Sequence, residues 1–118
     1  METTSFDPTL LERWRTFVAP GQLRQLALDF LAKLEEEVAG LGATLATGDR
    51  RLLAREAHAL VGSAANFGAV RISTLARALE LAAADADGTR LSDLHADLRA
   101  EVPRITASLK GWLETAGG

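Results

Sequence analysis

The chain has 118 residues, a formal net charge of −3 and no cysteine. Its length fits a single domain, residues 1–118, and the lack of cysteine excludes disulfides, thiolate zinc sites and cysteine nucleophiles. The mild acidity argues against nucleic acid as the main partner, because binding a phosphate backbone needs a basic face. The sequence has neither a secretory signal nor an apolar run of about 20 residues, so we expect no membrane segment and a cytoplasmic protein.

Strong helix formers dominate the composition, and five helical segments are predicted in chain order. The first begins at Asp7 and Pro8, an N-cap followed by proline at the first helical position. It is predicted to end at Pro20 and Gly21. Its apolar residues recur at helical spacing and include an aromatic pair that we interpret as core: Leu10, Leu11, Trp14, Phe17 and Val18.

The second and third segments are amphipathic helices over about 22–46 and 49–67. Asp49 is a candidate N-cap of the third helix, and Gly68 suits a left-handed position just beyond its end. One apolar stripe runs along the second helix: Leu23, Leu26, Phe30, Leu34, Leu41 and Leu45. A second stripe runs along the third helix: Leu53, Ala57, Leu60, Ala64 and Phe67.

The last two segments are predicted over about 69–86 and 91–115. Pro103 lies inside the final apolar pattern, where it either kinks the helix or marks a new start. Long helices with short connections favour an all-α, antiparallel up-and-down four-helix bundle. The first segment then becomes a short additional N-terminal helix, placed as a lid or at the flank.

His58 stands apart from the core stripe of the third helix. At 100° per residue it lies about 160° from Leu60 and about 100° from Ala57, so it points away from the core. Its neighbours on that face, three or four residues away, are Ala54, Arg55, Val61 and Gly62, with Ala65 a turn further on. Most of these are small, and a glycine inside a helix costs roughly 1 kcal/mol relative to alanine. Gly62 therefore serves either the close approach of another body or tight packing between helices.

Glu80 lies on the fourth helix, which is predicted to run antiparallel beside the third. A carboxylate there can accept a hydrogen bond from one ring nitrogen of His58. This bond fixes the tautomer and leaves the other nitrogen as a nucleophile. The plainer alternative for Glu80 is a solvated helix residue.

The stretch from His58 to Ala69, HALVGSAANFGA, resembles the signature of histidine-containing phosphotransfer (HPt) domains, and the segment that follows it closes with Leu79 and Glu80 as that family's next helix does. The matching positions are His58, Leu60, Gly62, Ser63, Gly68, Ala69, Leu75, Leu79 and Glu80. The resemblance implies a four-helix bundle that carries phosphoryl groups between receiver domains. It also implies that Glu80 is bonded to the imidazole.

Val61 departs from this signature, since the family usually has lysine three residues after the histidine. A lysine there would offer positive charge near the phosphoryl group. Three interpretations stay open. Arg55 or Arg77 replaces the missing charge, Val61 widens an apolar docking patch, or the domain binds receivers but transfers poorly.

The sequence therefore predicts a phosphorelay intermediate with His58 as phosphoacceptor, Glu80 as its orienting residue, and no kinase activity of its own because no nucleotide-binding loop is visible. The docking surface is predicted at Arg55, Ala59, Val61, Gly62 and Ala65. Expected partners are response-regulator receiver domains and a (hybrid) histidine kinase, without nucleic acid or membrane. We expect a free-standing monomer, because the chain starts at Met1 and shows no spare apolar stripe.

No cofactor is expected, and Mg²⁺ is assigned to the partner receiver. His95 is interpreted as a surface residue, and no spacing of ligands predicts a metal site. The alternative function is a non-catalytic helical adaptor, a degenerate HPt domain that binds a receiver or kinase without phosphotransfer.

Overall fold

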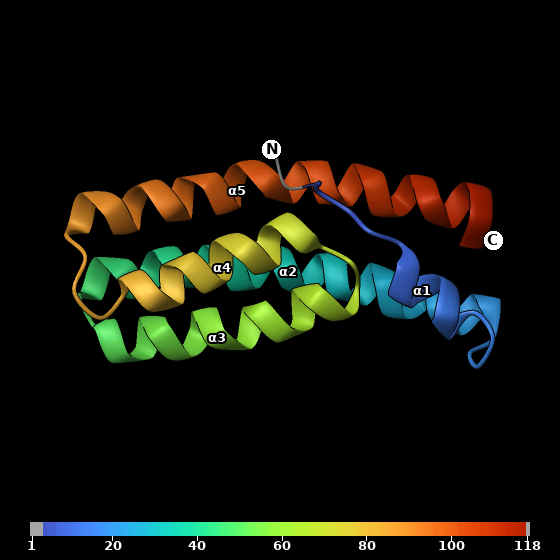
Figure 1. Ribbon diagram of the computed structural model, residues 1–118, viewed down its shortest axis with the longest axis horizontal. Helices are drawn as coiled ribbons and strands as arrows, with labels where there is room; N and C mark the ends of the chain where they lie inside the picture. Colours follow the sequence, from blue (N-terminus) through green and yellow to red (C-terminus); the bar gives the residue numbers. More distant parts are fainter. Residues whose placement is uncertain (1–3, 118) are drawn as a thin grey trace.

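Four helices lie antiparallel and side by side, and a short fifth helix packs at one end of them (Figure 1). The computed structural model describes residues 4–117. Within this range the helices are α1 (Thr9–Trp14), α2 (Pro20–Thr47), α3 (Arg50–Asn66), α4 (Val70–Ala82) and α5 (Gly88–Trp112), followed by a π-helical turn, Leu113–Gly117. The predicted all-α four-helix bundle with an additional N-terminal helix is thus confirmed. Within residues 4–117 no helix is both long and apolar enough to cross a membrane.

The core is a single cluster rich in leucine between the four bundle helices. The stripe predicted on α3 is confirmed, since Leu53, Ala57, Leu60 and Ala64 are buried. The stripe predicted on α2 is wrong at one position, because Leu26 is 41% exposed. Leu23, Phe30 and Leu34 already fill the side of α2 that faces the core, and Leu26 falls at its border.

The N-terminal segment differs from the prediction. Helix α1 ends at Trp14, and Pro20 is the first residue of α2 rather than the end of the first segment. Proline suits that position because its fixed φ fits the first turn and its missing N–H has no acceptor there. The interpretation of Phe17 as core is wrong, since it lies in the connection to α2 and is 87% exposed. Trp14 is half-buried beside Phe67.

Both ends of α3 are fixed as the sequence predicted. The Asp49 side chain accepts a hydrogen bond from the backbone N–H of Leu52. Gly68, with φ +72°, takes the left-handed position after the helix. Its carbonyl also accepts a hydrogen bond from the N–H of Asp7 at 2.8 Å, and the Asp7 backbone leaves no room for a Cβ at Gly68. Gly68 therefore ends α3 and also binds the segment that leads into α1.

Helix α5 continues through Pro103 without a break, so the helix does not start again there. Helix α4 is shorter than predicted and ends at Ala82. The interpretation of His95 as a surface residue is wrong. Its ring is half-buried against α2, with Nε2 2.8 Å from the carbonyl oxygen of Val38, in space that Gly42 leaves open.

Glu101 of α5 is a buried carboxylate that the sequence did not reveal, with only 1% of its surface exposed. One oxygen lies 3.4 Å from Nε of Arg71 and 3.4 Å from Nη1 of Arg104. The two partly exposed arginines pair with this one oxygen, Oε2, whereas Oε1 is buried without a hydrogen-bond partner among the described residues.

Candidate functional site

His58 lies near the middle of α3, on the side that faces away from the core. Its side chain is 68% exposed, while Ala57 before it and Leu60 after it are buried. The helical geometry alone produces this placement, because the core stripe fixes the rotation of α3 about its axis. The exposed outward position of His58 that the sequence predicted is confirmed.

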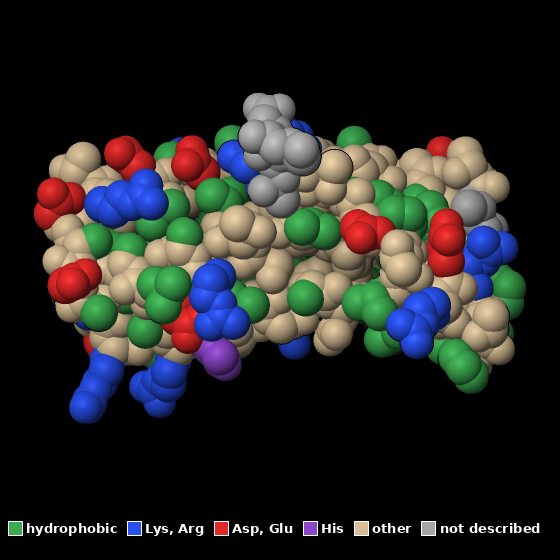
Figure 2. All heavy atoms as spheres, in the orientation of Figure 1, with side chains coloured by type: hydrophobic (Ala, Val, Ile, Leu, Met, Phe, Trp, Pro, Cys, Tyr) green, Lys and Arg blue, Asp and Glu red, His purple; other side chains and the backbone are tan. Residues whose placement is uncertain are grey.

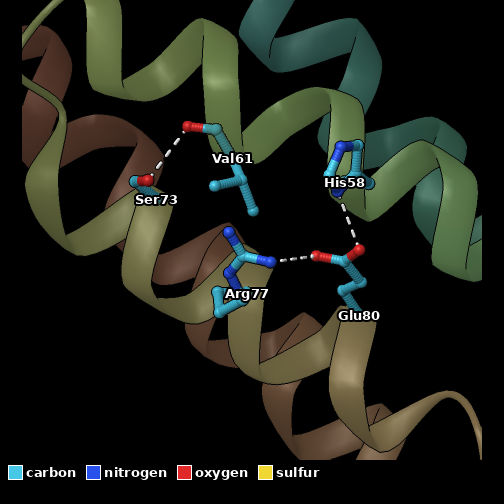
Figure 3. A network of polar contacts seen from close by, with 5 residues as sticks. All are labelled: His58, Val61, Ser73, Arg77 and Glu80. Carbon is cyan, nitrogen blue, oxygen red and sulfur yellow. Dashed lines mark hydrogen bonds and ion pairs between the residues drawn. The ribbon is translucent and has the colours of Figure 1, made fainter.

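In the part of the chain that the structure describes, one side of the imidazole has a hydrogen-bond partner. Its Nδ1 lies 2.8 Å from Oε2 of Glu80, which projects from the neighbouring helix α4 (Figure 3). An ionised carboxylate can only accept, so Nδ1 donates and carries the ring proton. Nε2 lies on the far side of the ring from Glu80 (Figure 3). The predicted hydrogen bond between these two side chains is present, and a neutral ring in this state has its lone pair on Nε2.

The other oxygen of Glu80 also has a partner. Nη1 of Arg77 donates to Oε1 of Glu80 at 3.0 Å, across one turn of α4. Close by, the hydroxyl of Ser73 donates to the backbone carbonyl of Val61 at 2.9 Å and ties α4 to α3. From the sequence, Arg77 is predicted only as a possible source of charge. The three-residue spacing to Glu80 is the signal for an ion pair on one helix face.

The predicted docking residues surround His58 on the outer side of α3. Arg55, Ala59, Gly62 and Ala65 are exposed, and Val61 is half-buried at the edge of the core. No atom outside the local helix backbone lies within 4 Å of the place where a Cβ of Gly62 would stand. Packing between helices therefore does not explain this glycine, and the surface beside the imidazole is left open.

Charge is distributed unevenly around the site. Figure 2 shows basic side chains gathered along the α3 edge of the molecule, and Arg51 and Arg55 are exposed there. On the side toward α2, Ala59 borders a groove with acidic walls, which is lined by Lys33, Glu36, Glu37, Gly40, Glu56 and Ala59. Within residues 4–117 no three His, Asp or Glu side chains are grouped to hold a metal ion.

Comparison with known proteins agrees with this geometry. The model of the Hpt domain family matches residues 25–111. No match is found among curated proteins. Among solved structures, histidine-containing phosphotransfer protein B (HptB) from Pseudomonas aeruginosa PAO1 superposes with a TM-score of 0.85 at 24% sequence identity, over 96% of this chain and 97% of that one.

The family match spans α3 and α4 completely and most of α2 and α5, so it includes every residue of the site around His58. The superposition shows that the fold of 96% of the chain is shared with a protein named as a phosphotransfer protein. The chain belongs to the Hpt domain family of phosphorelay proteins.

Proposed function

We propose that the chain accepts a phosphoryl group on His58 from the aspartyl phosphate of a receiver domain and passes it to the aspartate of another receiver. The observation that carries this proposal is the exposed imidazole whose Nδ1 is bound by Glu80 at 2.8 Å. A nucleophile oriented by a neighbouring acceptor, in a member of a phosphotransfer family, suits this reaction.

In the transfer step, the lone pair of Nε2 attacks the phosphorus in line with the bond to the aspartate oxygen. The N–P bond forms, the O–P bond breaks, and the electron pair of that bond returns to the aspartate carboxylate. Nδ1 keeps its proton throughout, and the Glu80 carboxylate stabilises the positive charge that develops on the ring. The return of the phosphoryl group to a second receiver is the same step in reverse.

The receiver supplies the Mg²⁺ and most of the charge stabilisation for this step. This chain supplies the oriented nucleophile and a surface on which the receiver docks. The exposed residues around His58, together with the half-buried Val61, support such a surface at Arg55, Ala59, Val61, Gly62 and Ala65. The partners we propose are response-regulator receivers and the receiver domain of a hybrid histidine kinase.

The test is phosphoryl transfer from a panel of phosphorylated receiver domains of the same organism to the wild-type chain and to His58→Gln. Glutamine keeps a similar size but lacks the nucleophile, so we expect rapid labelling of the wild type alone. ATP without a kinase should label neither. Label on the glutamine variant contradicts the assignment of His58. Tight binding to a receiver without an acid-labile, base-stable phosphate identifies the chain as a non-catalytic adaptor.

A further inference from the structure

The carboxylate of Glu80 is held at both of its oxygens. Oε2 lies 2.8 Å from Nδ1 of His58, and Oε1 lies 3.0 Å from Nη1 of Arg77 (Figure 3). A carboxylate with a partner on each oxygen has little freedom to turn about its last torsion. Arg77 therefore fixes the orientation of the acceptor on which the His58 tautomer depends.

The contact between Arg77 and Glu80 has the properties of a positioning contact. The guanidinium is planar and donates in a fixed direction, and the two residues lie one turn apart on α4. Glu80 is only 21% exposed, so water competes weakly for its oxygens. In the part of the chain that the structure describes, the other N–H groups of Arg77 have no protein acceptor. Nε2 of His58 lies on the far side of the ring from the guanidinium (Figure 3), so an effect of Arg77 on the ring passes through Glu80.

We infer that Arg77 is a positioning residue for phosphotransfer, which holds Glu80 against Nδ1 of His58 and so keeps Nε2 unprotonated and ready to attack. This inference rests on the proposed role of His58. Without Arg77, the Glu80 carboxylate can rotate away from the ring, and the neutral tautomer with its proton on Nε2 becomes populated. That tautomer has no lone pair on Nε2 and cannot form the N–P bond.

The first test needs no phosphate donor. Side-chain ¹⁵N NMR distinguishes the two neutral tautomers of His58 in the wild type, Arg77→Ala and Arg77→Lys. We expect the Nδ1–H form to predominate in the wild type, a mixture in Arg77→Ala, and partial recovery in Arg77→Lys, because lysine can still donate to Glu80 but lacks the fixed direction of a guanidinium. His95, bound to the carbonyl of Val38, is the reference within each spectrum and should not change. An unchanged tautomer ratio at His58 in Arg77→Ala overturns the inference.

The second test measures the rate of transfer from a phosphorylated receiver at saturation. Arg77→Ala should lower this rate about fivefold, as expected for a partly exposed coupled ion pair, while the receiver concentration for half-saturation stays the same. In a Glu80→Ala background, the same substitution should have no further effect. Arg99→Ala, an exposed arginine of α5, is the matched control and should transfer like the wild type.

An equal slowing by Arg77→Ala with and without Glu80 would show that Arg77 contacts the receiver or the phosphoryl group directly, which contradicts a positioning role. The two proposals also fail in different ways. If the wild type takes no phosphoryl group from any receiver, the proposed function fails, and the tautomer ratio still decides whether Arg77 orients His58 through Glu80.

Discussion

The two ring nitrogens of His58 have different surroundings, and this difference gives them different chemical roles. Nδ1 meets a carboxylate at 2.8 Å, while the side chain as a whole is 68% exposed. The ring can therefore keep its proton on one side and react on the other. At the scale of single residues, the acceptor that creates this difference is Glu80.

Replacing Glu80 tests this directly. Glu80→Ala should lower the saturated rate of phosphoryl transfer roughly tenfold, because it removes both the tautomer preference and the charge that stabilises the phosphorylated ring. Glu80→Gln should lower the rate less, since its amide oxygen still accepts a hydrogen bond from Nδ1. The measurement is single-turnover transfer at saturating receiver. Equal rates for the alanine and glutamine variants would contradict the hydrogen-bonding role.

Gly62 gives a prediction that separates stability from docking. A Cβ at this position meets no neighbouring side chain, so Gly62→Ala should raise the free energy of unfolding by about 0.5–1 kcal/mol through helix propensity. Gly62→Gln should also fold stably, but should increase the receiver concentration needed for half-maximal transfer. Urea unfolding and transfer kinetics measure the two effects.

The control for Gly62 is Gly111 of α5, where a Cβ likewise meets no neighbour. Gly111→Gln should leave transfer unchanged. If Gly62→Gln also transfers at wild-type receiver concentrations, no partner approaches closely at Gly62, and the docking surface must lie elsewhere on α3.

The exposed position of His58 follows from helical periodicity. Its bond to Glu80 was one of two interpretations that the residues left open, and the resemblance to HPt domains implied it. The sequence did not predict the bond between Arg77 and Glu80, which depends on rotamers that a sequence pattern does not fix. His95 was placed wrongly for a related reason. Charged neighbours along α5 suggested water, whereas the ring fits a space on α2 that exists because residue 42 is glycine.

At the scale of helices, the contact between Gly42 and His95 joins α2 to α5. A Cβ at Gly42 would stand 2.7 Å from Cε1 of His95, so Gly42→Ala must displace the ring from the Val38 carbonyl. The lost hydrogen bond, worth about 1 kcal/mol, offsets the gain in helix propensity of about 1 kcal/mol. We therefore expect little change in stability from Gly42→Ala alone.

In a His95→Ala background the steric conflict is absent, and Gly42→Ala should stabilise by about 1 kcal/mol. A double-mutant cycle by urea unfolding measures the coupling between the two positions. The same stability change from Gly42→Ala in both backgrounds would mean that His95 does not occupy the space that Gly42 leaves open.

Helix α1 depends on a local hydrogen-bond arrangement at Asp7. Hydrogen bonds from the Thr9 hydroxyl and backbone N–H lower the pKa of the Asp7 carboxyl below its usual value of 3.8. A lowered pKa in the folded state stabilises the protein above pH 3.8, and this contribution is lost as the pH falls through the lowered value.

The expected result is a thermal stability that decreases in acid partly because α1 loosens. Asp7→Asn keeps an acceptor for the N-terminal turn but has no carboxyl to protonate. The difference in Tm between the wild type and Asp7→Asn should therefore be constant near neutral pH and change only below pH 3.8. A constant difference down to pH 2 would exclude Asp7 as the titrating group.

Helix boundaries were the weakest part of the sequence prediction. Pro20 was interpreted as a stop because proline breaks helices, but the same residue starts α2, since the two roles differ only in which side of it is helical. The wrong prediction that Phe17 belongs to the core follows from this error. Once the chain leaves the helix at Trp14, the helical spacing no longer places Phe17 beside Trp14 on one helix face.

At the scale of the whole molecule, the site lies on the side of the bundle rather than at an end. Helices α2 and α5, with 28 and 25 residues, are longer than α3 and α4, with 17 and 13 residues. The shorter pair forms one face over part of the bundle, and α1 packs near the end of α3 (Figure 1). His58 therefore stands exposed on the flank of the bundle with Glu80 beside it, which suits contact with a second folded protein.

The charge distribution on this flank determines how docking should respond to salt. The chain carries a net charge of −3, yet Arg51 and Arg55 are exposed along α3 near His58. A phosphorylated receiver presents the negative phosphoryl group and the carboxylates that hold its Mg²⁺. Attraction between exposed charges is screened over about 10 Å at 0.1 M salt and about 3 Å at 1 M. Raising the salt should therefore increase the receiver concentration for half-maximal transfer.

The saturated rate should stay nearly constant with salt, because the Nδ1–Glu80 hydrogen bond is short and partly buried. Arg55→Ala should weaken the salt dependence of half-saturation, since it removes one of the screened charges. Arg99→Ala, on α5, should keep the wild-type dependence. A saturated rate that falls with salt as steeply as the affinity would mean that the arginines act in the transfer step itself. Attraction of the receiver and the rate of transfer would then depend on the same charges.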